Sequence, residues 1–237
     1  MMYSWRARIG VIAPLDDKVE YAFNKYAPDG VSFNSSRLAF SGNPTPENLI
    51  RMTDLLEETA KTYATQPHDV ILFGCTSGSC IKGFGFDKEC IERIERARGW
   101  PGLTTSTAVL EAYEALGLKK TVVMTPYPDD TNQAEKKFME DNGLEVTSIT
   151  GVGFNRNGPY SHAGTLHLYR NAKKINTDGA EVFFLSCMGL QTMELIEILE
   201  EDLGMPVITS HQASLWACLR HAGIKDKLPG LGKLFTI

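Results

Sequence analysis

Two cysteines end two similar apolar runs, and their spacing suggests that they act together. Cys75 closes the run Val-Ile-Leu-Phe-Gly-Cys, and Cys187 closes Val-Phe-Phe-Leu-Ser-Cys 112 positions later. The runs that end at Pro14 and Pro126 have the same separation, which indicates an internal duplication with one thiol in each half. A thiolate is a nucleophile or a base, and a thiol is an acid. If the halves face each other across a cleft, the two thiols can act on opposite sides of one small molecule.

The residues that follow each cysteine suit an anion. Thr76 and Ser77 supply hydroxyls, and the small residues around them can bring backbone N–H groups close to a ligand. Met188 and Gly189 follow Cys187, and a helical pattern that starts near 190 predicts a helix N-terminus there, which would lower the pKa of the thiol. The alternative is that both cysteines simply end buried strands. Their matched positions beside small polar residues favour a function.

The elements that must position these thiols form a β-α pattern. Apolar runs alternate with longer amphipathic segments, which is typical of a mainly parallel sheet. Thr45-Pro46-Glu47 predicts the start of one helix, and others are expected at about 131–142 and 190–203. Both thiols lie beyond the carboxyl ends of predicted strands, where open α/β sheets bind ligands. We expect strands at 7–13, 69–74, 120–125, 145–151, 181–186 and 206–209.

The duplication continues beyond the cysteines and predicts two lobes. The segments that begin at Pro101 and Pro206 also match, but their separation is 105, so the second half has lost seven residues. The first half carries a glycine-rich insertion at 82–87, and loops tolerate such changes of length. We predict that residues 1–103 together with 211–237 form an N-terminal lobe and that residues 104–210 form a C-terminal lobe.

Composition excludes several classes of protein. A net charge of −5, without any basic stripe, argues against a nucleic-acid partner. No apolar run approaches the ~18 residues of a membrane span, and the N-terminus runs into a strand rather than a signal segment, so we expect a cytoplasmic protein. The five cysteines include no C-x2-C pair, which argues against a disulfide framework and a structural zinc site. Cys90 and Cys218 are expected to be buried structural residues, and no nucleotide-binding motif is present.

Four motifs carry a family resemblance. They are Ile-Gly-Val-Ile-Ala-Pro14, Gly-Cys75-Thr-Ser-Gly-Ser, Met-Thr-Pro126-Tyr127 and Ser-Cys187-Met-Gly-Leu. Over residues 7–220 the chain resembles the aspartate/glutamate racemase superfamily, and within it the maleate isomerase and arylmalonate decarboxylase branch. The resemblance implies an α/β fold of two pseudo-symmetric lobes, each a mainly parallel sheet flanked by helices. It also implies a small carboxylate substrate in the cleft between the lobes, without a cofactor or a metal ion.

The same resemblance implies how the cysteines are used. Racemases of this kind use two cysteines as opposed base and acid, and maleate isomerases add one thiol across a double bond. Arylmalonate decarboxylases keep only the second cysteine and have glycine at the position that matches Cys75. The presence of Cys75 and Cys187 therefore departs from the decarboxylase pattern. Charge that develops on the reacting carboxylate would be stabilised by the backbone and hydroxyl donors of Thr76, Ser77, Tyr127, Met188 and Gly189, with Pro14 also contacting the substrate.

Two parts of the sequence differ from the maleate isomerase pattern, and the role of a third part is implied by that pattern. Asp16 and Asp17 follow Pro14 where those isomerases have an asparagine, and a carboxylate there suits an amino group or a protonated acid unless it belongs to a solvated turn. His211 replaces another asparagine and is either a substrate contact, a group that lowers a thiol pKa, or a structural histidine. The analogy makes Asn155 or Asn157 a carboxylate ligand, and the alternative is a loop turn.

These observations predict a cofactor-independent isomerase that acts on a small carboxylic or dicarboxylic acid through Cys75 and Cys187. The reaction is cis–trans isomerisation or racemisation. One alternative is a malonate-type decarboxylase in which Cys187 donates the proton, and another is a non-catalytic protein that binds small anions. The sequence leaves open whether the chain forms a homo-oligomer.

Overall fold

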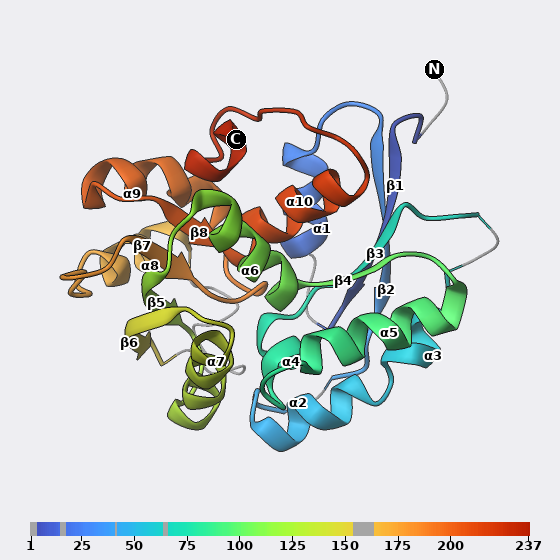
Figure 1. Cartoon of the computed structure of the whole chain (residues 1–237), viewed down its shortest axis with the longest axis horizontal. Helices are drawn as coiled ribbons and strands as arrows, with labels where there is room; N and C mark the ends of the chain where they lie inside the picture. Colours follow the sequence, from blue (N-terminus) through green and yellow to red (C-terminus); the bar gives the residue numbers. More distant parts are fainter. Residues whose placement is uncertain (1–3, 15–17, 41, 64–65, 154–163) are drawn as a thin grey trace.

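Two four-stranded parallel sheets form the framework of the computed structural model (Figure 1). The structure describes residues 4–14, 18–40, 42–63, 66–153 and 164–237. The strand order is β2-β1-β3-β4 in the first sheet and β6-β5-β7-β8 in the second, and every pair is parallel. The first sheet contains β1 (Ala7–Ala13), β2 (Val31–Arg37), β3 (Val70–Phe73) and β4 (Gly102–Thr104). The second contains β5 (Lys120–Thr125), β6 (Glu145–Gly151), β7 (Val182–Leu185) and β8 (Val207–Thr209).

All six predicted strands are confirmed, three of them with the same bounds, but β2 and β4 were not predicted. The sequence of β2 is Val-Ser-Phe-Asn-Ser-Ser-Arg, and none of its residues is fully buried because it is an edge strand of the sheet. Such a strand lacks the apolar run that identifies the inner strands β1 and β3. The three residues of β4 are too few to produce a pattern.

The helices fill the connections between the strands. Thr45 caps α2 as predicted, since its hydroxyl accepts a hydrogen bond from the amide of Asn48, and Leu49 and Met52 of this helix are buried. The longest helices, α5 and α7, have 13 residues, and none of the described helices has the length and apolar character needed to cross a bilayer. The helices are α1 (Lys18–Tyr26), α2 (Pro46–Thr53), α3 (Leu56–Ala60), α4 (Thr76–Cys80), α5 (Phe86–Arg98), α6 (Thr105–Leu116), α7 (Asp129–Asp141), α8 (Thr165–Ala172), α9 (Ile196–Leu203) and α10 (Ser210–His221), with 3₁₀ turns η2 (Met193–Leu195) and η3 (Lys233–Thr236).

The duplication is confirmed by equivalent hydrogen bonds in the two sheets. The carboxylate of Asp69 accepts from the amide of Arg8, and Glu181 accepts from Lys120 at the same 112-residue offset. Beyond the cysteines, Glu95 accepts from Gly102 at 3.1 Å and Glu200 accepts from Val207 at 3.0 Å, at the 105-residue offset. The two halves therefore share their strand ends and connections, and the predicted two-lobed α/β fold is confirmed.

Helices α6 and α10 join the two sheets. They pack against each other, and Figure 1 shows them between the sheet on the right (β1–β4) and the sheet on the left (β5–β8). One apolar core runs from the first sheet through Ala108 and Leu215 on these helices to Phe184 in the second sheet. A second cluster, which includes Leu49 and Phe73, lies between the first sheet and α2, α3 and α5. The assignment of residues 104–210 to one lobe stays a prediction.

Candidate active site

Cys75 is the N-cap residue of the short helix α4. Its Sγ accepts a hydrogen bond from the amide of Gly78 at 3.3 Å, and only 8% of the residue is exposed. Gly78 makes this contact possible, because a Cβ at that position would lie 2.9 Å from Sγ and 2.7 Å from Cε of Met52. Burial raises the pKa of Cys75 to about 12, although the Gly78 hydrogen bond acts in the opposite direction. At neutral pH this group is therefore a thiol.

Cys187 occupies a strained turn at the end of β7. Its φ of 128° lies in the left-handed region that residues with a Cβ rarely adopt. Its Sγ accepts a hydrogen bond from the amide of Gly189 at 3.2 Å. The predicted helix start near 190 is wrong, because residues 188–190 form a turn and α9 starts at Ile196 after η2, whereas the predicted end at 203 is confirmed. The amide of Gly189, rather than a helix N-terminus, is thus directed at this thiol.

One serine hydroxyl holds both cysteine segments. Ser210, the first residue of α10, accepts a hydrogen bond from the amide of Cys187 at 2.9 Å and another from the hydroxyl of Thr76 at 2.8 Å. The thiols are also electrostatically coupled, because negative charge on Cys187 raises the pKa of Cys75. The structure therefore brings the two predicted cysteines together at one junction between the sheets.

Two further serines support the turn after Cys75. Ser79 donates to Ser106 at 2.7 Å, and Ser106 donates to the carbonyl oxygen of Thr76 at 3.0 Å. All of these groups are buried, as is Ser77. Buried hydroxyls that are fully hydrogen-bonded fix their backbone in one position. The segment that carries Cys75 is therefore tied to α6 as well as to α10.

Three other predicted site residues also lie at strand ends. Tyr127 is buried after β5, where its amide donates to Thr125 and its carbonyl oxygen accepts from Asn132. Met188 is buried beside Cys187, and Pro14 is half-buried after β1. These positions agree with a cleft at the carboxyl ends of both sheets, although contact of these residues with a substrate stays a prediction.

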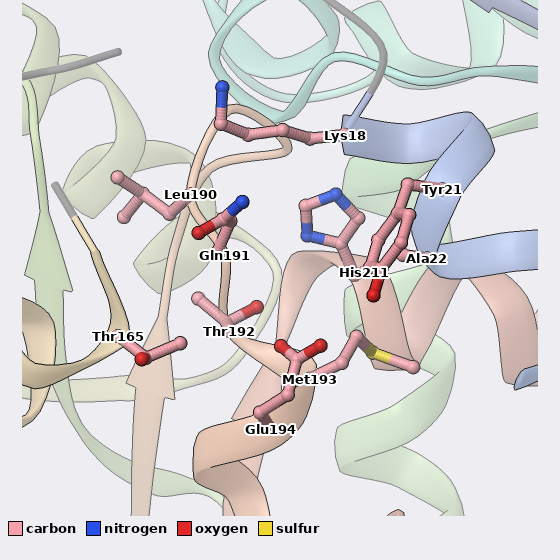
Figure 2. A pocket seen from close by; sticks show the side chains of 10 residues that line it. All are labelled: Lys18, Tyr21, Ala22, Thr165, Leu190, Gln191, Thr192, Met193, Glu194 and His211. Carbon is pink, nitrogen blue, oxygen red and sulfur yellow. The ribbon is translucent and has the colours of Figure 1, made fainter. Parts of the chain in front are cut away.

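His211 lies in the wall of a cavity of about 360 Å³ (Figure 2). Its imidazole is almost fully buried and faces the space between Gln191 and Tyr21. Lys18 and Glu194 line the same cavity, and Glu194 forms an ion pair with Lys25 at 3.0 Å. Neither cysteine is among the described residues that line it. His211 is thus next to Ser210 in the chain and faces a cavity beside α1.

The remaining predicted ligands, Asp16, Asp17, Asn155 and Asn157, lie outside the described residues, so their roles stay predictions. Sequence reasoning missed Ser210 and Gly78. The 105-residue offset aligns Ser210 with Thr105, the hydroxyl residue that begins α6, which was the available signal. Within the described segments, no group of three or more His, Cys, Asp or Glu side chains is placed to hold a metal ion.

Comparisons with known proteins agree with this geometry. The family model for arylmalonate decarboxylase matches residues 9–235. The arylmalonate decarboxylase of Bordetella bronchiseptica is 30% identical over 200 residues, which cover 82% of each chain. The maleate isomerase Iso from Pseudomonas putida S16 superposes with a TM-score of 0.90 at 23% identity, covering 97% of this chain and 98% of that one, and a cysteine-to-alanine variant of it was solved with maleate.

A second isomerase shares the fold. The maleate cis–trans isomerase of Nocardia farcinica has a TM-score of 0.90 at 19% identity, with coverage of 97% and 98%, and its cysteine-to-serine variant holds a covalently bound succinylcysteine intermediate. The resemblance that the cysteine motifs indicated is confirmed by the family model and by the 30% identical relative. The chain belongs to the arylmalonate decarboxylase family.

Proposed function

We propose that this protein is a cofactor-independent isomerase of a small carboxylic or dicarboxylic acid, acting by cis–trans isomerisation or racemisation. The observation that carries the proposal is the pair of thiols on segments that share Ser210. A decarboxylase of this family requires only the second thiol, whereas an isomerase needs two groups that act on one substrate. The presence of both Cys75 and Cys187 therefore favours isomerisation.

The coupling between the thiols suits acid–base chemistry. Because negative charge on Cys187 raises the pKa of Cys75, loss of one proton from the pair opposes loss of the second. Once the pair has lost one proton it holds one thiolate and one thiol, which are the base or nucleophile and the acid that the reaction needs. The high pKa of Cys75 means that this thiol loses its proton most readily while Cys187 is still a neutral thiol.

For a cis-dicarboxylate the steps are as follows. The Cys75 sulfur, as thiolate, forms a bond to one alkene carbon, and Cys187 delivers a proton to the other carbon. The former double bond is now single and rotates. Cys187 removes the proton again, the carbon–sulfur bond breaks, and the trans acid leaves. A succinyl group on sulfur, as in the Nocardia farcinica relative, is what thiol addition to an unsaturated four-carbon diacid yields.

The buried donors near the thiols support a carboxylate as the reacting group. Addition or deprotonation next to a carboxyl group places negative charge on its oxygens, and fixed amide donors stabilise such charge. We propose that the segments after Cys75 and Cys187 supply those donors together with Tyr127. Asp16 and Asp17 would favour a substrate with an amino group or a protonated acid. We also propose a cytoplasmic location, which rests on the sequence prediction alone.

The test combines product analysis with cysteine variants. Maleate, single enantiomers of 2-substituted acids and substituted malonates are incubated with the protein in D2O and followed by NMR. We expect fumarate, or deuterium at the α-carbon with loss of optical purity, and we expect Cys75→Ala and Cys187→Ala each to abolish it. Cys90→Ala, which removes a buried thiol of α5, is the control. Unchanged turnover in Cys75→Ala would rule out the two-thiol mechanism.

A decarboxylase is the second candidate, favoured by the 30% identity to the Bordetella bronchiseptica enzyme. In that reaction the malonate loses carbon dioxide, and Cys187 protonates the planar intermediate. The same experiment separates the two, since carbon dioxide release that survives Cys75→Ala but not Cys187→Ala identifies the decarboxylase. Binding of these acids without any reaction would indicate the anion-binding alternative.

A further inference from the structure

A buried carboxyl group lies behind the thiol pair without an ordinary partner. Glu135 belongs to α7 and is 2% exposed. Neither of its carboxyl oxygens makes a hydrogen bond of normal geometry to a described residue. A buried carboxylate without a partner is strongly disfavoured, so such a group holds its proton.

Glu135 is adjacent to both cysteine segments. With Thr76, Cys80 and Ser106 it lines a cavity of about 10 Å³, which has room for no more than a single water-sized molecule and so excludes substrate. The hydroxyl of Ser186 is also buried without a partner among the described residues, and it is near enough to the carboxyl to lower its pKa. Because Thr76 follows Cys75 and Ser186 precedes Cys187, the carboxyl stands at the back of both thiol segments.

The charged state of Glu135 affects the groups that face it. Burial raises the pKa of Glu135 to about 7, and no basic side chain of the described chain contributes to that pKa. Negative charge on Glu135 raises the pKa of Cys75 and Cys80 on the α4 side and of Tyr113 on α6. The other lining side chains from α6 and β7 are Val109, Leu110 and Phe184, which are apolar.

We propose that Glu135 is a positioning residue for the thiol pair: as a neutral carboxylic acid it donates to Ser186 and keeps a second negative charge away from the reacting thiolate. The proposal deepens the proposed function and rests on it for its catalytic meaning. When Glu135 ionises, its charge opposes the formation of a thiolate at Cys75. The Glu135 carboxylate and the Cys75 thiolate therefore disfavour each other. The enzyme reacts with substrate in the form in which Glu135 is protonated.

The first experiment measures the thiol directly and needs no substrate. Carbamidomethylation of Cys75 by iodoacetamide is followed by peptide mass spectrometry from pH 6 to 10 in the wild type and in Glu135→Gln. Because the neutral amide cannot ionise, we expect the labelling rate of Cys75 above pH 7 to be several-fold higher in the variant. Glu140→Gln, which removes an exposed carboxylate paired with Lys136 on the same helix, should leave the profile unchanged.

A Glu135→Gln profile that superimposes on the wild type, in a protein with native circular dichroism, would overturn the proposal. If that variant does not fold, the wild-type protein supplies the second test. Infrared spectra of protein labelled with ¹³C-glutamate should show a protonated carboxyl band at pH 6 that disappears as the pH rises to 8. Absence of the band at pH 6 would equally refute the assignment. Both measurements report on Glu135 even where the NMR assay finds no isomerase activity, so the two failures are distinguishable.

Discussion

The hydroxyl oxygen of Ser210 lies 2.9 Å from the amide nitrogen of Cys187, and this hydrogen bond anchors a left-handed residue to the first turn of α10. Since the hydroxyl also accepts from Thr76, it is the point at which the two cysteine segments meet.

Ser210→Ala is expected to destabilise the protein and impair turnover together. The substitution leaves the Cys187 amide and the Thr76 hydroxyl as buried donors without their acceptor, at a cost of about 1–3 kcal/mol each. Urea unfolding measures the stability, and the NMR assay measures turnover. Ser214→Ala, another buried serine of α10, is the matched variant and should retain more activity. Equal turnover in the two variants would contradict the role given to Ser210.

Gly78→Ala is expected to displace the Cys75 thiol. The new Cβ would lie 2.9 Å from Sγ and 2.7 Å from Cε of Met52, and overpacking of this kind costs about 1–3 kcal/mol. Gly74→Ala is the control, because its Cβ would meet neighbours at 3.5–3.8 Å, which are ordinary contact distances. Thermal unfolding and turnover should both separate the two variants. A Gly78→Ala protein as active as Gly74→Ala would show that the position of the thiol does not depend on the absence of a Cβ at residue 78.

Stability should depend on pH through Glu135. Its pKa is raised from 4.5 to about 7, so the native state binds more protons than the unfolded state in that interval, and the free energy of unfolding falls as the pH rises through it. Below pH 4.5 the carboxyl group is protonated in both states and does not change the free energy of unfolding. Well above pH 7 it is ionised in both states, and the whole decrease in the free energy of unfolding persists. Relative to wild type, Glu135→Gln should gain up to about 3 kcal/mol between pH 4.5 and 8, measured by urea unfolding. A difference that is independent of pH would count against a buried, titrating carboxyl group.

Cys75 should react slowly with iodoacetamide in the substrate-free protein. Burial raises its pKa to about 12, so its thiolate is scarce at pH 8 and labelling should keep increasing toward high pH. Protein unfolded in urea provides the reference, since there all five cysteines are exposed. Rapid labelling of native Cys75 at pH 7, with a plateau above it, would mean that the thiol is ionised at rest.

The sequence predicted the inner strands and the cysteine pair because both repeat. Val70–Phe73 and Val182–Leu185 are apolar runs at one offset, and each is followed by its cysteine. The edge strand Val31–Arg37 left no such pattern, because its polar side chains face solvent.

The predictions from the sequence that were wrong or missing near the site have a different cause. Leu190 and Met193 are buried as a helix face would be, but burial does not distinguish a helix from the turn that Cys187 imposes. The contact between Thr76 and Ser210 joins positions 134 residues apart, and Glu135 lies behind them without a local pattern. Only the folded chain reveals such pairings.

The packing of helices α6 and α10 between the two sheets affects how small molecules reach and leave the thiols. The apolar core that continues through them would be exposed to water if the two sheets moved apart, and exposing apolar surface costs about 25 cal/mol per Å². Separation of the two sheets would therefore carry an energetic cost, and a route to the thiols that keeps the sheets packed together avoids that cost.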